Sequence, residues 1–259
     1  MTRLAEVTMV GEILAGLITS ALTATAAVAW RHRLRLFTPS RDVRVSFCAL
    51  LRVRDDDCYL LFHARSRPGS YSPPGGVYKY SREGEQQLEQ LGFRDEPKPS
   101  DLVNDRRHDL RGFISSRVTR KFLRWFESGA GRESATACLR RELVEELTEV
   151  GHPELIDDVA SLEFTPVRVV QEGPHHEPGT DHLHLRRFDV YDIAVARDET
   201  AAQFKQRLLA LIGGPASDLV AGAGARDIEY GRCEAGLISG HAAFLIGTKR
   251  FHPPTPAVR

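Results

Sequence analysis

Three glutamates near the middle of the chain constrain its fold and chemistry most. Glu142, Glu145 and Glu146 follow the spacing i, i+3 and i+4, so a helix through them places all three carboxylates on one face. Crowding like charges in this way is unfavourable unless a cation binds. Oxygen ligands suit Mg²⁺, which keeps several waters and is held jointly by carboxylates and substrate phosphates. The spacing therefore predicts a Mg²⁺ site, with these three glutamates as ligands, that reads a phosphate-bearing molecule.

The same helix has a second interpretation. Arg140 and Arg141 lie beside the glutamates, and a helix of this composition is often a solvated face with i, i+4 ion pairs. Two further features favour the metal site. Glu133 stands eight positions before Arg141, and a glycine turn, Gly75–Gly76, lies far upstream.

This arrangement resembles the Nudix box. The resemblance implies an α/β (α+β) fold over residues 43–252, a Nudix-type mixed sheet sandwiched by helices, with Tyr71, Gly75 and Gly76 lining the ligand site. Gly76 and Glu133 are 57 positions apart where the family has six, so a 51-residue insertion, residues 77–127, splits the box. The closing glycine of the box falls on Thr148, and we expect Gly151 to end the helix instead.

The overall composition excludes several classes of protein. The chain has 259 residues, 42% of them apolar, which suits one large or two small globular domains. Its 35 basic and 35 acidic side chains cancel, so no global field draws it to nucleic acid. Its four cysteines are scattered without a C-x-x-C pair, which argues against a zinc knuckle or a secreted disulfide framework and favours a reducing compartment.

An apolar run near the amino terminus predicts a membrane anchor. Residues 9–30 contain one charged side chain, Glu12, and residues 13–30 contain none, which just reaches spanning length. The basic segment 31–42 follows, so the positive-inside rule places the carboxyl-terminal domain in the cytoplasm and makes the chain a single-pass protein of the cell inner membrane. A cleaved signal peptide, with small residues at 24–29, and a buried globular helix are the alternatives.

The same run carries small residues on one side. Ala15, Thr19, Thr23 and Ala27 recur every four positions, and small side chains let membrane helices approach closely. Glu12 is costly in a bilayer unless it faces a bundle or water. Both features predict self-association in the membrane.

The segments between these motifs have readable patterns. Residues 43–53 alternate like a strand, 58–63 look like its hairpin partner, and Asp55–Asp57 forms the turn, since a calcium loop needs a different spacing. After the box, 163–171 and 183–194 are predicted strands, 199–212 a helix, and 238–246 a helix near the end.

The insertion divides into a polar stretch, 81–107, and a predicted helix, 110–126. Four cations fall on one side of that helix at i, i+3, i+4 and i+7: Arg117, Arg120, Lys121 and Arg124. A basic amphipathic helix either packs with its cations in solvent or binds phosphates or a membrane surface. Its position between the two halves of a phosphate-reading motif favours ligand binding.

Two other groups of side chains have candidate roles. Tyr71, Tyr78 and Tyr80 flank the glycine turn, where they either stack on a base or pack at the rim. A second group could in principle bind zinc or phosphate, although no carboxylate or thiolate stands in register with it: His175, His176, His182 and His184.

A membrane helix followed by an enlarged Nudix-like domain resembles the transmembrane-Nudix (SMODS-associated NUDIX) effectors of bacterial cyclic-oligonucleotide antiphage signalling, the systems known as CBASS. The resemblance implies a receptor. A partner nucleotidyltransferase makes a cyclic oligonucleotide, the Nudix-like domain binds it, and the membrane helices of a homo-oligomer disrupt the lipid bilayer and kill the cell.

Two alternatives to the receptor stay open. One is a membrane-anchored, Mg²⁺-dependent Nudix pyrophosphohydrolase of nucleoside diphosphate derivatives, in which Glu145 and Glu146 hold the metal and Glu142 assists, so that Glu142 and Glu145 are catalytic. The other is a catalytically inactive interaction module.

Overall fold

A computed structural model describes residues 40–64, 67–97, 108–196, 198–214 and 218–252. Contacts divide the chain into two units, Met1–Ser40 and Arg41–Arg259. The predicted membrane helix, 9–30, and most of the basic linker, 31–42, lie outside the described residues. Within the part that is described, no helix has the length and apolar character needed to cross a bilayer.

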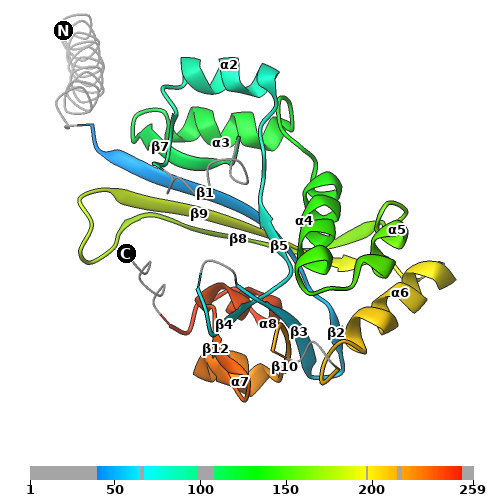
Figure 1. Cartoon of the computed structure of the whole chain (residues 1–259). Coiled ribbons are helices and arrows are strands. Elements are labelled where there is room, and N and C mark those ends of the chain that lie inside the picture. Colours follow the sequence, from blue (N-terminus) through cyan, green and yellow to red (C-terminus); the bar gives the residue numbers. More distant parts are fainter. Residues whose placement is uncertain (1–39, 65–66, 98–107, 197, 215–217, 253–259) are drawn as a thin grey trace, which may run out of the picture. The chain divides into compact units, whose positions relative to one another are not determined.

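The first sheet is built around β1 (Asp42–Leu51), the strand that the alternation of residues 43–53 predicts. Val43, Val45 and Phe47 turn one face of β1 inward and are fully buried. The strand order is β6-β7-β1-β9-β8, and β5 (Gly75–Val77) also pairs with β1 (Figure 1). β9 runs parallel to β1 and the other neighbours are antiparallel, so the sheet is mixed. The remaining strands are β6 (Arg94–Asp95), β7 (Arg111–Ser115), β8 (Phe164–His176) and β9 (Leu183–Ile193).

A second sheet holds the strand that was expected to pair with β1. β3 (Cys58–His63) forms its hairpin with the two-residue strand β2 (Arg54–Asp55), across a turn in which Asp56 has a φ of 44°. The predicted pairing of β3 with β1 is therefore wrong. Both faces of β3 are apolar and its central residues are buried, so the strand needs cover on both sides. The order of this sheet is β10 (Val220–Ala223), β3, β4 (Ser70–Ser72), β12 (Gly236–Ile238) and β11 (Arg232–Cys233).

Two hydrophobic cores hold these sheets in place. The first packs one face of β1 against α3 (Thr119–Ser128), α4 (Ala135–Glu149) and α6 (Glu199–Leu209). The second packs the other face, through Leu50, against the second sheet, α7 (Ala225–Tyr230) and α8 (Ala243–Ile246). Every buried residue of both cores lies between Val43 and Leu245, so the part of the chain after Arg41 contains its own cores.

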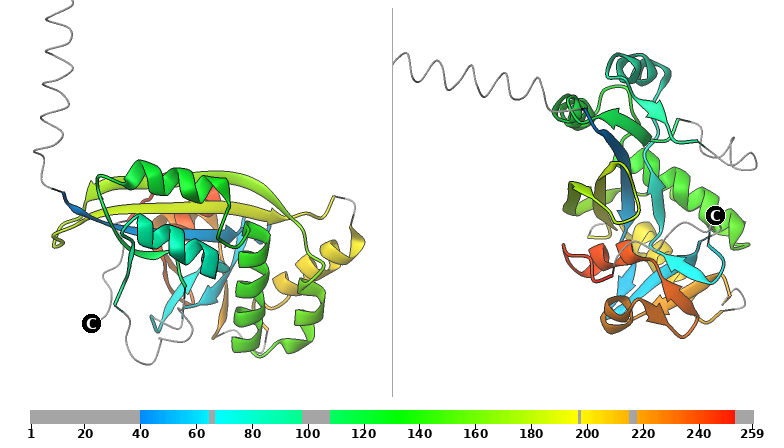
Figure 2. Two further views of the ribbon diagram at one scale, coloured as in Figure 1. Left: turned by 90° about the horizontal axis from the view of Figure 1, so that it is seen from above. Right: turned by 90° about the vertical axis from the view of Figure 1, so that its left-hand side faces the viewer.

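The insertion forms part of the first sheet and two helices over it. The predicted helix 110–126 is wrong in its first half, because β7 pairs with β1 residue by residue and only α3 is helical. Phe122 and Phe126 of α3 pack edge-on against Phe47 of β1, with ring centroids 5.3 and 4.6 Å apart. The polar stretch contributes a full helix, α2 (Arg82–Gln90), whose Gln87 accepts a hydrogen bond from the Trp125 indole at 2.5 Å. Figure 2 shows α2 and α3 side by side over one end of the sheet.

The later elements follow the sequence more closely. β8, β9 and α6 confirm the predicted strands and helix, although β8 runs on to His176. The predicted helix 238–246 is split into the end of β12, a 3-10 turn (Gly240–Ala242) and α8. α4 is preceded by a short connection from α3 and followed by a 3-10 turn (Pro153–Leu155) and α5 (Ile156–Val159).

Gly151 ends α4, as the displaced box glycine suggests. Its φ is +80°, the left-handed region, and its N–H donates to the Thr148 carbonyl at 3.3 Å. The His152 N–H donates to the Leu147 carbonyl at 2.9 Å, which completes a Schellman motif. The helix that carries the glutamates therefore extends three residues past the family position of its cap.

We expect Gly151→Ala to lower the free energy of unfolding by about 1 kcal/mol, because alanine is strained at positive φ. Gly247→Ala is the matched control, since Gly247 also follows a helix but has an extended φ of −153°, and a Cβ there would meet nothing closer than the Ala243 carbonyl oxygen at 4.0 Å. Urea denaturation measures both changes. Equal effects of the two substitutions would contradict the assigned cap.

Candidate functional site

The carboxylate of Glu146 lies against the backbone of the glycine turn. Its two oxygens accept from the Gly75 N–H at 3.3 and 3.4 Å, and no cation pairs with it within the described chain. Burial, followed by the negative charge of Glu142, holds the pKa of Glu146 well above its ordinary value. This carboxyl group is therefore poised to gain from a positively charged ligand.

Glu142 lies one helical turn earlier and reaches the next glycine. A Cβ atom at Gly76 would stand 2.1 Å from the Glu142 carboxyl carbon, so only glycine leaves room for this side chain. Gly75 has a different constraint, because its φ is +121° and a Cβ there would meet the Ala49 carbonyl oxygen at 2.3 Å. The two glycines thus serve two purposes, close strand pairing and space for a carboxylate.

Arg141 binds three of the box glutamates. Its guanidinium donates to Glu133 at 2.7 Å and to Glu142 at 2.6 Å, and lies 3.3 Å from Glu145. It also donates to the Val77 carbonyl at 3.0 Å. Burial raises the pKa of Glu142, and the adjacent Arg141 opposes that rise. Arg141 therefore fixes α4 to the strand that carries the glycines.

The three predicted metal ligands are not equivalent. The Glu145 side chain is 46% exposed, whereas Glu142 and Glu146 approach the glycines. Arg141 Nη1 contacts both Glu142, at 2.6 Å, and Glu145, at 3.3 Å. In the described ranges, no three acidic, histidine or cysteine side chains are arranged to hold a metal, so the predicted three-carboxylate group is not formed. The remaining pair, with its raised pKa values, fits a divalent ion that takes two protein carboxylates and completes its shell with water and phosphate oxygens.

A pocket opens beside Glu146. Its volume is about 320 Å³, and it has apolar walls with two acids and one imidazole: Phe62, His63, Glu146, Glu149, Val150 and Leu219. The Gly69 N–H donates to His63 Nε2 at 3.0 Å, so the neutral ring carries its proton on Nδ1. The pocket places apolar walls beside the Glu146 carboxylate, an arrangement that suits a base or sugar attached to a phosphate.

The cations chosen from the sequence lie elsewhere. Arg120, Lys121 and Arg124 are on the exposed side of α3, opposite the buried Phe122 and Phe126, and Arg117 lies in the turn before that helix. Within the described part of the chain, Arg120, Lys121 and Arg124 form no ion pair with a box glutamate. Their role in ligand binding stays a prediction.

Two other cations of the insertion lie nearer to the box and were missed. Arg111 of β7 pairs in register with Ser46 of β1, is half-buried, and forms no ion pair with another described residue. Burial raises the pKa of the Cys48 thiol to about 11. The positive charge of Arg111 is the strongest influence that lowers this pKa, and the negative charge of Glu142 raises it further. Arg111 and Glu142 therefore both act on the same thiol. Strand pairing with β1, which the helical spacing concealed, is the only signal that would have found Arg111.

Lys79 follows the glycine strand and is also half-buried. Its backbone N–H donates to the Glu133 carboxylate at 2.7 Å. The backbones of Lys79 and Asp109 form an isolated antiparallel β-bridge. No ion pair of its ammonium group is found among the described residues.

The tyrosines near the glycine turn are not free to stack on a base. Tyr71 is 4% exposed, and its hydroxyl donates to the Asp218 carbonyl at 2.8 Å. Tyr78 is 1% exposed and donates to Asp189 at 2.9 Å, while Tyr80 donates to Asp95 at 3.2 Å. The Tyr71 ring belongs to the second core, and a role for Tyr71 in the ligand site stays a prediction.

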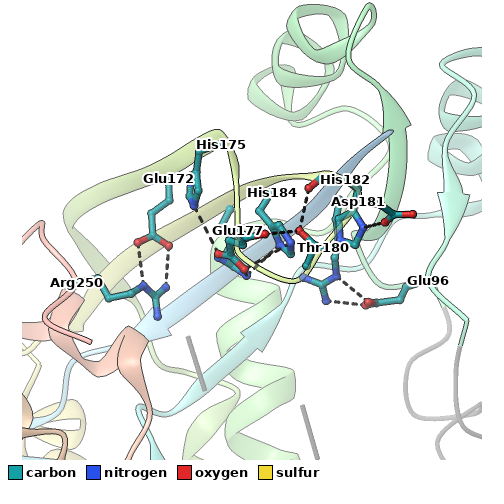
Figure 3. A network of polar contacts seen from close by, with 11 residues as sticks. Glu96, Glu172, His175, Glu177, Thr180, Asp181, His182, His184 and Arg250 are labelled. Atoms are coloured by element: carbon teal, nitrogen blue, oxygen red, sulfur yellow. Dashed lines mark hydrogen bonds and ion pairs between the residues drawn. The ribbon is translucent and has the colours of Figure 1, made fainter. Parts of the chain in front are cut away.

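The histidines gather in a polar network instead of a zinc site (Figure 3). Glu177 is held by both guanidinium nitrogens of Arg186, and its oxygens lie 3.5 Å from His175 Nε2 and from His184 Nε2. His182 Nδ1 bonds to Asp181 at 3.0 Å. Since the described residues contain no three-ligand group, the zinc alternative is not supported. The network ties the β8–β9 hairpin together.

We expect acid to destabilise the fold through His184. Burial lowers the pKa of His184 to about 4, so between pH 6.5 and 4 the unfolded chain takes up a proton that the folded chain does not. Stability then falls with decreasing pH by up to about 1.4 kcal/mol per unit in that window. His184→Gln should flatten the slope, whereas replacing the exposed His176 should not. Thermal unfolding measured at several pH values tests this, and parallel curves for all three proteins would exclude it.

We also expect the two glycines to respond differently to alanine. Gly75→Ala strains the backbone and meets a carbonyl, so it should cost about 2 kcal/mol or more of stability. Gly76→Ala meets only the mobile end of Glu142, so it should leave stability nearly unchanged but displace that carboxylate and weaken divalent-cation binding. Denaturation and Mn²⁺ titration of both variants separate the effects; the reverse order of stabilities would show that the assignments are wrong.

Comparison with known proteins agrees with this geometry. The family model for the SMODS-associated NUDIX domain matches residues 42–246, which is more than half of the chain. Searches of curated proteins and of solved structures found no match. On this match, and on the α+β architecture of two mixed sheets with helices, the chain belongs to the SMODS-associated NUDIX domain family.

Proposed function

We propose that this chain is an effector of a CBASS antiphage system that binds a cyclic oligonucleotide through its Nudix-like domain. Family membership supports the link to CBASS. The observation that carries ligand binding is Glu146, which lines a pocket with apolar walls and forms no ion pair with another described residue.

Ligand binding uses both parts of this site. The pocket beside Glu146 accepts a base, with Phe62 and Leu219 as apolar walls. Glu142 and Glu146 would hold a Mg²⁺ ion, which would neutralise the charge of an adjoining phosphate. Arg111 contributes a positive charge from the insertion, and its charge and that of Glu142 both act on the Cys48 thiol.

Binding in preference to hydrolysis is supported by the exposure of Glu145. This glutamate is 46% exposed and shares Arg141 with Glu142, so the third carboxylate of the box faces solvent and is already paired with an arginine. The alternative is a membrane-anchored Mg²⁺-dependent pyrophosphohydrolase. It is favoured by the intact contacts of Arg141 with Glu133 and Glu142.

The output is disruption of the inner membrane. A ligand shifts assembly only if it binds one assembled state more tightly than another. Soluble domains that gather around a ligand, which a partner nucleotidyltransferase makes, bring together the helices predicted at 9–30. Their small-residue ridges then pack, and Glu12 opens a leak through the lipid.

Calorimetry on residues 41–259, with cyclic di- and trinucleotides as titrants and with or without Mg²⁺, tests ligand binding. We expect one cyclic nucleotide to bind with Mg²⁺-dependent affinity. Glu146→Gln should remove the Mg²⁺ dependence, and Arg111→Gln should weaken binding about tenfold, as expected for loss of one charge-assisted contact. Arg226→Gln, an exposed cation of α7, is the matched control. Failure of every cyclic nucleotide to bind would contradict the receptor.

Chromatography of the same mixtures separates the two functions. The receptor returns the cyclic nucleotide unchanged after hours with Mg²⁺. Metal-dependent cleavage of nucleoside diphosphate derivatives that is lost in Glu142→Gln would establish the hydrolase instead.

A further inference from the structure

β8 is an outer strand of the first sheet and pairs on one side only. Its partner is β9, and no other described strand bonds to it. Apart from Val170 its residues are exposed or half-exposed, and Val169, near its middle, is 54% exposed. Figure 1 shows the strand at the margin of the sheet. An edge of this length presents unpaired backbone groups to a further strand.

The ends of the available edge are marked by prolines. Pro166 and Pro174 lack an N–H group, and register shifts occur next to both of them, at Pro166/Arg168 and Glu172/His175. Pairing with another strand is therefore confined to residues 167–173. Because the two prolines stand equally far from Val170, this segment is symmetric about that residue, as a two-fold contact requires.

The charged residues of β8 also favour a two-fold axis at Val170. In an antiparallel pair with its two-fold axis at Val170, Arg168 of each copy lies opposite Glu172 of the other, and Val169 lies opposite Gln171. An axis at Val169 would place Arg168 opposite Val170, and an axis at Gln171 would place Glu172 opposite Val170. In both of these registers the charged residue faces an apolar one and the Arg168–Glu172 pairs are lost. Arg168 and Glu172 both point to the face that carries Val170, because their partners on β9 are Val190 and Arg186. The edge is thus complementary to itself in one register.

Arg168 also lacks a partner in the single chain. It is half-buried and forms no ion pair or hydrogen bond with another described residue. Burial and the nearby charge of Arg52 lower the pKa of its guanidinium. Glu172, in contrast, is held by two bonds from Arg250, at 2.9 and 2.7 Å, which fix its carboxylate at the edge.

We propose that two copies of this chain associate through β8, antiparallel and centred on Val170, to form one continuous sheet. The contact does not involve the ligand site, so it goes beyond the proposed function and does not depend on it. Each copy's Arg168 gains the other's Glu172 as an anion, and the exposed Val169 side chains are covered.

Sedimentation equilibrium on residues 41–259 without nucleotide tests the dimer. We expect a dimer for the unaltered protein and at least about tenfold weaker association for Val169→Lys, because a lysine at an edge strand opposes pairing. Leu237→Lys is the matched control: Leu237 has the same 54% exposure but lies on β12 of the other sheet. A monomer at all concentrations, or a dimer that only Leu237→Lys disrupts, would overturn the proposal.

Cross-linking tests the register without relying on Glu172. The pair Val169→Cys and Gln171→Cys, both at exposed positions, should give a covalent dimer on oxidation, in a Cys58→Ser background that removes the exposed native thiol. Val169→Cys with Thr165→Cys, which the proposed register does not align, should cross-link much more slowly. Equal rates for the two pairs would contradict the Val170-centred contact.

Discussion

The close approach of α4 to the glycine strand β5 is the contact on which the rest of the site depends. Gly76 leaves space for the Glu142 carboxylate, and the Gly75 N–H reaches Glu146. Arg141 adds a bond to the Val77 carbonyl, so helix and strand are joined at three successive residues. Two acids are thereby held in a partly desolvated position, which raises the pKa of both. Burial makes the ionised form of these two acids unfavourable, and a cation bound in the proposed site would offset that penalty.

The insertion leaves this contact intact because its ends meet. The backbone N–H of Lys79 donates to the Glu133 carboxylate at 2.7 Å, and the backbone N–H of Glu133 donates to the Lys79 carbonyl at 3.0 Å. The backbones of Tyr80 and Arg132 form an isolated antiparallel β-bridge beside these two bonds. Long insertions are tolerated when their ends are close, since the entropy of closing a loop grows slowly with its length. The extra residues widen the sheet through β7, which carries Arg111.

Local patterns predicted much of this fold, and long-range pairing accounts for most of the errors. The alternation in Val43, Val45 and Phe47 and the helical spacing of the glutamates are properties of single elements, and both appear as expected. Gly151 as the cap follows from local chemistry as well. The strand β7 and the second sheet depend on which distant segment offers a partner, and periodicity carries no such information. Arg111 was missed for that reason. The burial of Tyr71, whose hydroxyl is satisfied by a carbonyl 147 positions away, is a long-range feature of the same kind.

The most direct test of the central claim is electron paramagnetic resonance of Mn²⁺ added to residues 41–259, with and without a bound cyclic nucleotide. We predict that the protein removes the free Mn²⁺ signal, more strongly with the nucleotide present, and that Glu146→Gln abolishes this while Glu145→Gln changes it little. An unaltered signal of free Mn²⁺ under both conditions, or loss of binding in Glu145→Gln alone, would contradict the account.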